Sequence, residues 1–130
     1  MLRAAGALLV LLACTGPAGA QQVTSEILVH TTLTAGLAHH EAKQVWDSMR
    51  VGDAIALVRE PGNAHDPNAV RVEWHSHMLG YLPREDNETI ARQIDRGNRL
   101  SGRIVRLDRY RNHRMRLGID IYLALQPAAR

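Results

Sequence analysis

Cysteine, lysine and aromatic residues are all scarce in this chain of 130 residues. Cys14 is the single cysteine, so no disulfide can form within the chain. Phenylalanine is absent, and the chain has only three tyrosines and two tryptophans. No apolar run after residue 20 is long enough for a membrane helix, which takes about 20 residues. Since there is no internal repeat either, we expect at most one small domain, with neither a disulfide nor a membrane-spanning helix.

The first 20 residues have the pattern of a secretory signal peptide. A basic start at Arg3 precedes an apolar run over residues 4–13, and small residues at 18–20 form a cleavage site. We therefore predict a secreted or periplasmic protein that is cleaved near Ala20. Residues 11–14 also resemble a bacterial lipobox, so the alternative is a lipoprotein anchored through Cys14.

Positive charge is concentrated in one part of the chain. Residues 21–91 hold five cations and ten acids, a balance of −5, whereas residues 92–116 hold nine arginines and two acids, a balance of +7. Such asymmetry indicates an anionic partner for one face, although arginines that only solvate an exposed strand and helix would produce the same count. Lys43 is the single lysine, and arginine binds phosphate and flat rings better than lysine does.

The spacing of apolar residues predicts six strands and two helices. Strands are expected over residues 26–34, 54–60, 69–74, 78–82, 100–108 and 115–125. Helical spacing predicts a helix over residues 38–49, with Trp46 in the core, and a second helix that Asp86 or Asn87 caps and Gly97 ends. Helix–strand alternation is too weak for a parallel sheet. The pattern predicts a mainly β fold, with two α-helices packed on a small antiparallel β-barrel.

A polar loop between two of these strands is the most unusual stretch of the chain. Residues 60–68, EPGNAHDPN, combine acids, asparagines and a histidine with two prolines. Proline fixes φ, and asparagine and aspartate cap their own backbone, so the loop is expected to be stiff. Glu60, His65 and Asp66 also contain the ingredients of an acid–base site with one metal.

Other histidines offer weaker arguments for a metal. His75 and His77 lie in a predicted hairpin turn, but two ligands do not make a structural zinc site, which needs four. His39 and His40 are expected to be exposed at the start of the first helix. We assign no metal, and whether one binds at His75 and His77 stays open. The sequence contains no nucleophile elbow, P-loop or HExxH motif.

Several short motifs together resemble the HIRAN domain family. They are Gly52-Asp, Leu57-Val-Arg-Glu-Pro, Asn63-Ala-His-Asp-Pro-Asn-Ala-Val, Leu79-Gly-Tyr-Leu-Pro-Arg and Asn87. The resemblance runs from about residue 27 to residue 123, within a single domain over residues 21–130, and the chain is similar to the stand-alone bacterial form. It implies an OB-like β-barrel that binds single-stranded DNA, notably at a free 3′ end.

The same resemblance implies roles for individual residues. Asp66 would accept a hydrogen bond from the terminal 3′-hydroxyl, and Asn63 and Asn68 would shape or line the same pocket. His65 and Tyr81 hold positions where flat rings sandwich the last bases, and such stacking is worth about 1–3 kcal/mol per base. The family's N-terminal stacking residue has no secure equivalent here, because an extra helix precedes Gly52.

We expect a non-catalytic nucleic-acid-binding module with no cofactor and no catalytic residue. Arg59, Arg84, Arg103 and Arg106 would neutralise phosphates, so binding should weaken steeply with salt. Further arginines expected to contribute are Arg109, Arg111, Arg114 and Arg116. One alternative is an envelope interaction module that binds a protein or a glycan without needing these arginines. A second is a metal-dependent hydrolase of phosphate esters or acid anhydrides. The oligomeric state is left open.

Overall fold

The computed structural model describes residues 25–125, so the predicted signal peptide, with Cys14 and Ala20, lies outside the described residues. The strands are β1 (Ser25–Leu33), β2 (Ala54–Arg59), β3 (Val70–Trp74), β4 (His77–Tyr81), β5 (Leu100–Arg109) and β6 (Met115–Leu125). The helical segments are η1 (Leu37–His39), α1 (Ala42–Val45), η2 (Trp46–Ser48) and α2 (Arg84–Asp95). Within the described range, no helix has the length and apolar character that crossing a membrane requires.

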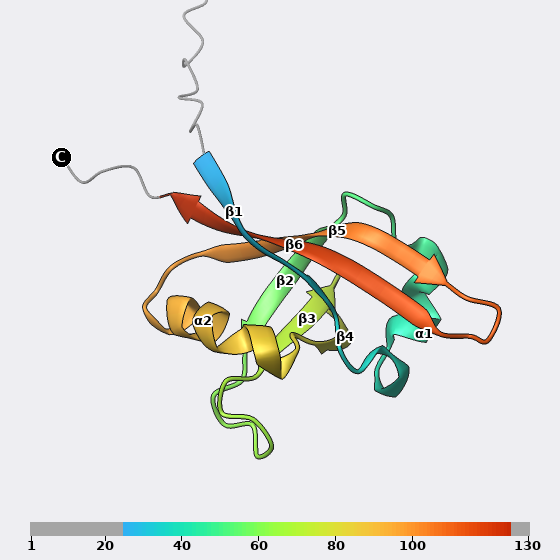
Figure 1. The fold of residues 1–130 in the computed structure, drawn as a ribbon, viewed down its shortest axis with the longest axis horizontal. Coiled ribbons are helices and arrows are strands. Elements are labelled where there is room, and N and C mark those ends of the chain that lie inside the picture. Colours follow the sequence, from blue (N-terminus) through green and yellow to red (C-terminus); the bar gives the residue numbers. More distant parts are fainter. Residues whose placement is uncertain (1–24, 126–130) are drawn as a thin grey trace, which may run out of the picture.

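The six strands form one curled antiparallel sheet, in the order β1-β6-β5-β2-β3-β4 (Figure 1). β1 and β4 are its two edges. The chain just after β1 meets β4 at one isolated bridge, where Ala35 and Tyr81 exchange backbone hydrogen bonds of 2.8 and 2.9 Å. We call this pair the edge bridge. The predicted mainly β, antiparallel fold is confirmed, but the barrel is open, because one bridge alone joins its edges in the described chain.

The core follows the alternation read from the sequence. Leu117, Ile119 and Ile121, which alternate along β6, are fully buried. Trp46 and Ile90, from the two helical regions, are also buried and belong to the same cluster. Residues that point to one side of a strand are two apart, so one apolar face per strand is enough to build this core. The sheet is thus held by packing along one face, and its loops are free to carry polar side chains.

The first predicted helix is the main difference from expectation. Residues 38–49 form three short segments instead of one helix, and Leu37, not Ala38, is buried. The break lies at His40, whose backbone is extended, with φ −132° and ψ −161°. Next to it, Glu41 accepts a hydrogen bond from the Met78 backbone at 2.7 Å and donates its own N–H to the Met78 carbonyl at 2.9 Å. These two hydrogen bonds to β4 replace the hydrogen bonds that a continuous helix would form at this point.

The start of α2 also differs from expectation. Pro83 occupies the cap position, so Asp86 and Asn87 lie inside the helix and do not cap it. Their side chains instead reach other elements. Asp86 accepts a hydrogen bond from Thr32 of β1 at 2.6 Å, and Asn87 donates to Asp66 of the polar loop at 2.7 Å. The helix ends as predicted at Gly97, whose φ of 87° favours glycine.

Candidate functional site

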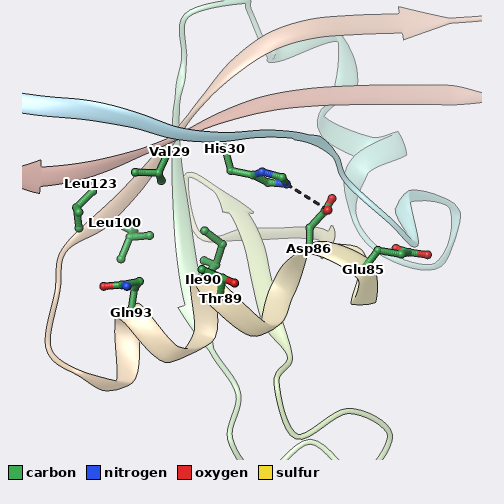
Figure 2. Close-up of a pocket in the computed structure, with 9 residues that line it drawn as sticks. All are labelled: Val29, His30, Glu85, Asp86, Thr89, Ile90, Gln93, Leu100 and Leu123. Carbon is green, nitrogen blue, oxygen red and sulfur yellow. Dashed lines mark ion pairs between the residues drawn. The ribbon is translucent and has the colours of Figure 1, made fainter.

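A groove lies between β1 and α2 (Figure 2). It holds about 300 Å³, and no arginine or lysine lines it. His30 Nε2 lies 3.3 Å from Asp86, and Glu85 adds a second acid. The hydrogen bond from Thr32, followed by the contact with His30, lowers the pKa of Asp86. A groove with this acidic edge repels phosphate, and none of the predicted site residues lines it.

The polar loop, residues 60–68, is braced by its own side chains on the other side of α2. Asn63 Oδ1 accepts hydrogen bonds from the backbone N–H groups of His65 at 2.9 Å and Asp66 at 3.0 Å. The Asn63 amide donates to Glu60 at 3.0 Å. Arg84 of α2 donates to the His65 carbonyl at 2.7 Å. Both polar atoms of Asn63 are therefore used within the loop, which explains its fixed shape.

Asp66 is oriented by two donors. Its Oδ1 accepts the backbone N–H of Asn68 at 2.9 Å, and its Oδ2 accepts the amide of Asn87 at 2.7 Å. Asn87 is only 2% exposed, whereas the side chain of Asp66 is 18% exposed. A carboxylate has about four lone-pair sites. Asp66 is thus held in place and can still accept hydrogen bonds from a ligand.

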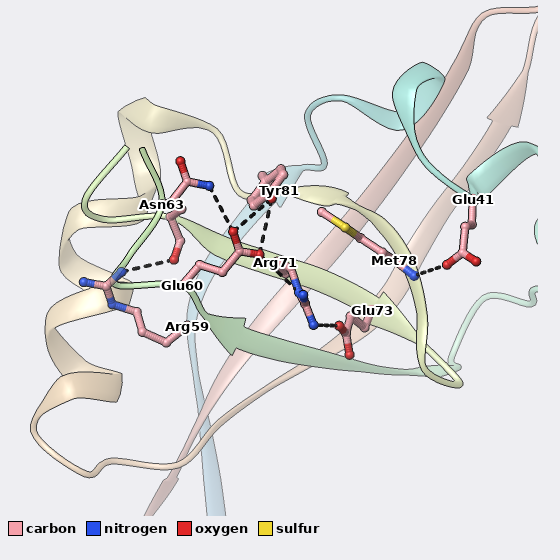
Figure 3. A network of polar contacts seen from close by, with 9 residues as sticks. Glu41, Arg59, Glu60, Asn63, Arg71, Glu73, Met78 and Tyr81 are labelled. Carbon is pink, nitrogen blue, oxygen red and sulfur yellow. Dashed lines mark hydrogen bonds and ion pairs between the residues drawn. The ribbon is translucent and has the colours of Figure 1, made fainter. Parts of the chain in front are cut away.

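Tyr81, on edge strand β4, is held by a polar network that Figure 3 shows. Its hydroxyl donates to Glu60 at 3.1 and 3.3 Å. Glu60 also accepts a hydrogen bond from Asn63. The guanidinium of Arg71 lies 3.3 Å from the Glu60 carboxylate and forms a second ion pair with Glu73. Burial, and then the hydrogen bond and charge of Glu60, raise the pKa of Tyr81. The hydroxyl therefore remains protonated, and the network fixes the plane of the ring.

These groups meet in a pocket of about 410 Å³, which we call the loop pocket. Its lining residues are Ala35, His40, Asn63, His65, Asp66, Ala69, Tyr81, Leu82, Pro83 and Arg84. The structure thus brings together five of the predicted residues: Asn63, His65, Asp66, Tyr81 and Arg84. It adds His40, whose ring lies edge-on to that of Tyr81 with centroids 5.6 Å apart. Sequence reasoning missed His40 because it assigned that residue to the exposed start of a helix.

Comparison with known proteins assigns the chain to a family. The HIRAN domain pattern matches residues 27–126, most of the chain. This chain belongs to the HIRAN domain family. HIRAN domains are DNA-binding modules. A crystal structure of a Lactobacillus plantarum protein is similar to this HIRAN domain with a TM-score of 0.71 and 28% identity, over 79% of this chain and 99% of that one.

Two further relatives match a smaller share of this chain. The HIRAN domain of human HLTF shares the fold, with a TM-score of 0.61 and 18% identity over 76% of this chain and 78% of that one. A Fanconi-associated nuclease 1 homolog from Oryza sativa subsp. japonica is 36% identical over 77 residues. That match covers 56% of this chain and 8% of the rice protein, so the present HIRAN domain corresponds to a small part of that relative.

Arg59 and Asn68, predicted for the site, do not line the loop pocket of this HIRAN domain. The side chain of Arg59 is 13% exposed and donates to Asp95 of α2 at 3.0 and 3.2 Å and to the Ala69 carbonyl at 3.1 Å. It therefore fastens β2 to α2 and is not available to a phosphate. Asn68 contributes its backbone N–H to Asp66, so it helps to shape the pocket without lining it.

Arg103 and Arg106, also predicted for the site, lie on β5, away from the loop pocket. In the sheet, Arg103 of β5 lies opposite Ala54, which is at the end of β2 away from the polar loop. Its guanidinium is 3.6 Å from the Glu26 carboxylate. Arg106 forms an ion pair with Asp108. The sequence shows that positive charge is concentrated over residues 92–116, but not where in the fold each arginine lies. These two arginines were therefore expected at the site from their charge alone.

The histidines considered for a metal have other neighbours. The rings of His75 and His77 pack against Trp74, with centroids 4.3 and 6.1 Å away. Across residues 25–125, no three His, Cys, Asp or Glu side chains gather as metal ligands. Glu60 faces Tyr81, Asn63 and Arg71 and does not join His65 and Asp66 in one ligand set.

Proposed function

We propose that this HIRAN domain binds the free 3′ end of single-stranded DNA in the loop pocket. The observation that carries the proposal is Asp66, an oriented and partly exposed carboxylate beside the rings of His65, Tyr81 and His40. A terminal 3′-hydroxyl is a donor that an internal nucleotide lacks. Asp66 would accept a hydrogen bond from this hydroxyl, and the rings would stack on or flank the last base.

The edges of the pocket suit a nucleotide in other ways. Arg84, whose side chain is 71% exposed, lies 3.9 Å from Asp66 and supplies a cation for the last phosphate. The Tyr81 ring is fixed by Glu60, so it would lose little freedom when a base stacks on it. His65 and His40 present flat rings with less stacking surface than tyrosine. The pocket therefore favours one terminal nucleotide over a long run of stacked bases.

The test compares strands that differ only at the 3′ end. Fluorescence anisotropy would measure the affinity of the domain for one strand with a free 3′-hydroxyl and one with a 3′-phosphate. A hydrogen bond to a charged group is worth about 1.5–3 kcal/mol, so the phosphate should weaken binding by about 10- to 100-fold. Equal affinity for the two strands would refute the proposal.

Variants connect this preference to one residue. In Asp66→Asn the charge is lost but the side chain can still bond to Asn87, so the fold should survive and the preference for the 3′-hydroxyl should shrink toward equality. Glu85→Gln removes the same charge from the first turn of α2, and it should leave the preference unchanged. The preference is a ratio measured on one protein sample, so partial unfolding cannot imitate its loss.

The proposed role needs no chemical step, and we propose a binding module, not an enzyme. Secretion remains a prediction from residues outside the described range. If it holds, the DNA would be extracellular, such as environmental or biofilm DNA. The mass of the protein recovered from the periplasm and the medium would test cleavage near Ala20.

A further inference from the structure

We propose that the tip of the β5–β6 hairpin is a second DNA contact that holds the phosphodiester backbone of the strand whose 3′ end occupies the loop pocket. We call residues 110–116 the hairpin tip. The inference rests on the proposed function for its ligand, but a different set of residues carries it. It assigns a direction to the bound strand, from its 3′ end in the loop pocket to its 5′ side on the hairpin tip.

Three arginines and a tyrosine share one shallow pocket at the hairpin tip. Arg111, Arg114 and Arg116, together with Tyr110 and Asn112, line a shallow pocket of about 360 Å³. The guanidinium carbon of Arg116 lies 5.6 Å from the centre of the Tyr110 ring. This combination of cations with a flat ring is what single-stranded nucleic acids bind, because phosphates and bases can be contacted together.

These three cations differ from most other arginines of the domain. Among the described residues, Arg59, Arg71, Arg84, Arg92, Arg103, Arg106 and Arg109 each have a carboxylate within 4 Å. No such ion pair is found for Arg111, Arg114 or Arg116 in residues 25–125. Like charges gathered without counter-charges repel one another and favour an anion between them.

The hairpin tip has a defined backbone that can present these side chains together. Tyr110 donates its N–H to the Arg114 carbonyl at 2.8 Å, and His113 donates to the Tyr110 carbonyl at 2.9 Å. His113 has a φ of 64°, a conformation typical of tight hairpin turns. The arginines therefore project from a closed turn, which lowers the cost of ordering them around a phosphate.

A chain of cavities connects the hairpin tip to the loop pocket. A pocket of about 400 Å³ is lined on one side by Thr34 and residues 36–39 and on the other by Asn112, His113, Arg114 and Met115. Asn112 and Arg114 also line the hairpin-tip pocket, and neighbouring Ala35 and His40 line the loop pocket. In Figure 1 the η1 turn lies between the polar loop and the hairpin tip. A strand that leaves the loop pocket across η1 therefore meets the arginines.

The test uses two matched triple variants and strands of two lengths. Arg111→Gln, Arg114→Gln and Arg116→Gln remove the hairpin charges together. Arg92→Gln, Arg96→Gln and Arg99→Gln remove the same charge from the end of α2 and the turn after it. Anisotropy would be measured with strands of about four and about 12 nucleotides, since one OB fold covers about 4–16 nucleotides. Each strand would carry either a free or a phosphorylated 3′ end, and each measurement would be repeated over a series of salt concentrations.

The hairpin variant should lose affinity for the longer strand and keep its affinity for the shorter one. Each phosphate contact contributes about 0.7 to the slope of log affinity against log salt for a single strand, so three lost contacts should reduce that slope by about 2. The preference for the 3′-hydroxyl should be unchanged. The α2 variant should show a much smaller change, because its charge loss acts only at a distance.

The outcomes separate this inference from the proposed function. Equal losses in the two triple variants, or an equal loss for both strand lengths, would overturn the hairpin contact and leave the loop pocket standing. A hairpin-dependent affinity without any preference for the 3′-hydroxyl would overturn the loop pocket and its strand direction, while supporting the hairpin as a DNA contact. An unchanged salt slope in the hairpin variant would also reject the inference.

Discussion

The edge bridge makes one substitution especially informative, namely Gly80→Ala in β4. A Cβ atom at residue 80 would lie 2.2 Å from the carbonyl oxygen of Ala35 and 3.0 Å from Cγ2 of Thr34. Backbone cannot yield as the end of a flexible side chain can, so the chain after β1 must move away by about 1 Å to restore normal contact. That movement breaks the bridge between Ala35 and Tyr81.

The magnitude follows from what the movement costs. Two backbone hydrogen bonds, of 2.8 and 2.9 Å, would be lost or stretched, each worth about 1 kcal/mol net. Overpacking adds about 1–3 kcal/mol. The free energy of unfolding should therefore fall by about 3–5 kcal/mol, a large share of the 5–15 kcal/mol typical of a domain. The melting temperature should drop by more than about 12 °C, at about 4–8 °C per kcal/mol.

Thermal and urea unfolding followed by circular dichroism would measure this change. Gly62→Ala is the matched control, because a Cβ there meets nothing within 4 Å, and its effect should stay within about 0.5 kcal/mol. DNA affinity of folded Gly80→Ala protein should also fall, since the bridge positions the Tyr81 ring. If the two variants proved equally stable, the edge bridge would not hold the open sheet together and this reasoning would be wrong.

Three further predictions concern Tyr81 of the loop pocket, Asn87 beside it, and Asp86 of the groove between β1 and α2. Tyr81→Phe should cost about 1 kcal/mol of stability through its lost hydrogen bond. It should weaken DNA affinity only slightly, because the ring remains but is no longer held by Glu60, as urea unfolding and anisotropy would check. Asn87→Ala should cost about 1–3 kcal/mol, because Asp66 loses a buried donor, and should weaken the 3′-hydroxyl preference. Asp86 has a lowered pKa in the fold, so it stabilises the protein above the unfolded pKa of about 3.9 and this stabilisation is lost as pH falls through the folded pKa. Asp86→Asn should therefore flatten the acid side of a stability–pH curve, and an unchanged slope would contradict the role of Thr32.

The strands were predictable because their information is local. Alternation over residues 115–125 corresponds to β6, and its central apolar residues are buried as the period of two requires. The polar loop was also predictable as a stiff site, since Asn63 and Asp66 bond to backbone within three residues. Gly97 ends α2 for the same local reason, a backbone conformation that glycine tolerates.

What the sequence did not reveal depends on contacts between distant segments. Arg59 was expected to meet phosphate, but Asp95, 36 residues later, binds it. His40 was expected to be exposed, but a bond between Glu41 and β4 breaks the helix and brings His40 beside Tyr81. Helical spacing in the sequence cannot show such a break, because the competing hydrogen bonds come from another strand. Resemblance to a family predicted the residues of the polar loop, but it did not predict the ring of His40.

The residues proposed to recognise the 3′-hydroxyl and the arginines proposed to attract the phosphates lie on different surfaces of this domain. This separation links the proposed loop-pocket site to the proposed hairpin contact. The loop pocket contains the acid Asp66 and adjoins the acid Glu60, with Arg84 as the one arginine or lysine among its lining residues. Such a pocket can recognise a hydroxyl, but it offers little attraction for a polyanion. Binding strength must then come from another surface, and the hairpin tip gathers three arginines that have no carboxylate partner in the described chain. A 3′ end would be selected by the pocket while its backbone is retained by the hairpin, so specificity and salt dependence should be altered by different substitutions.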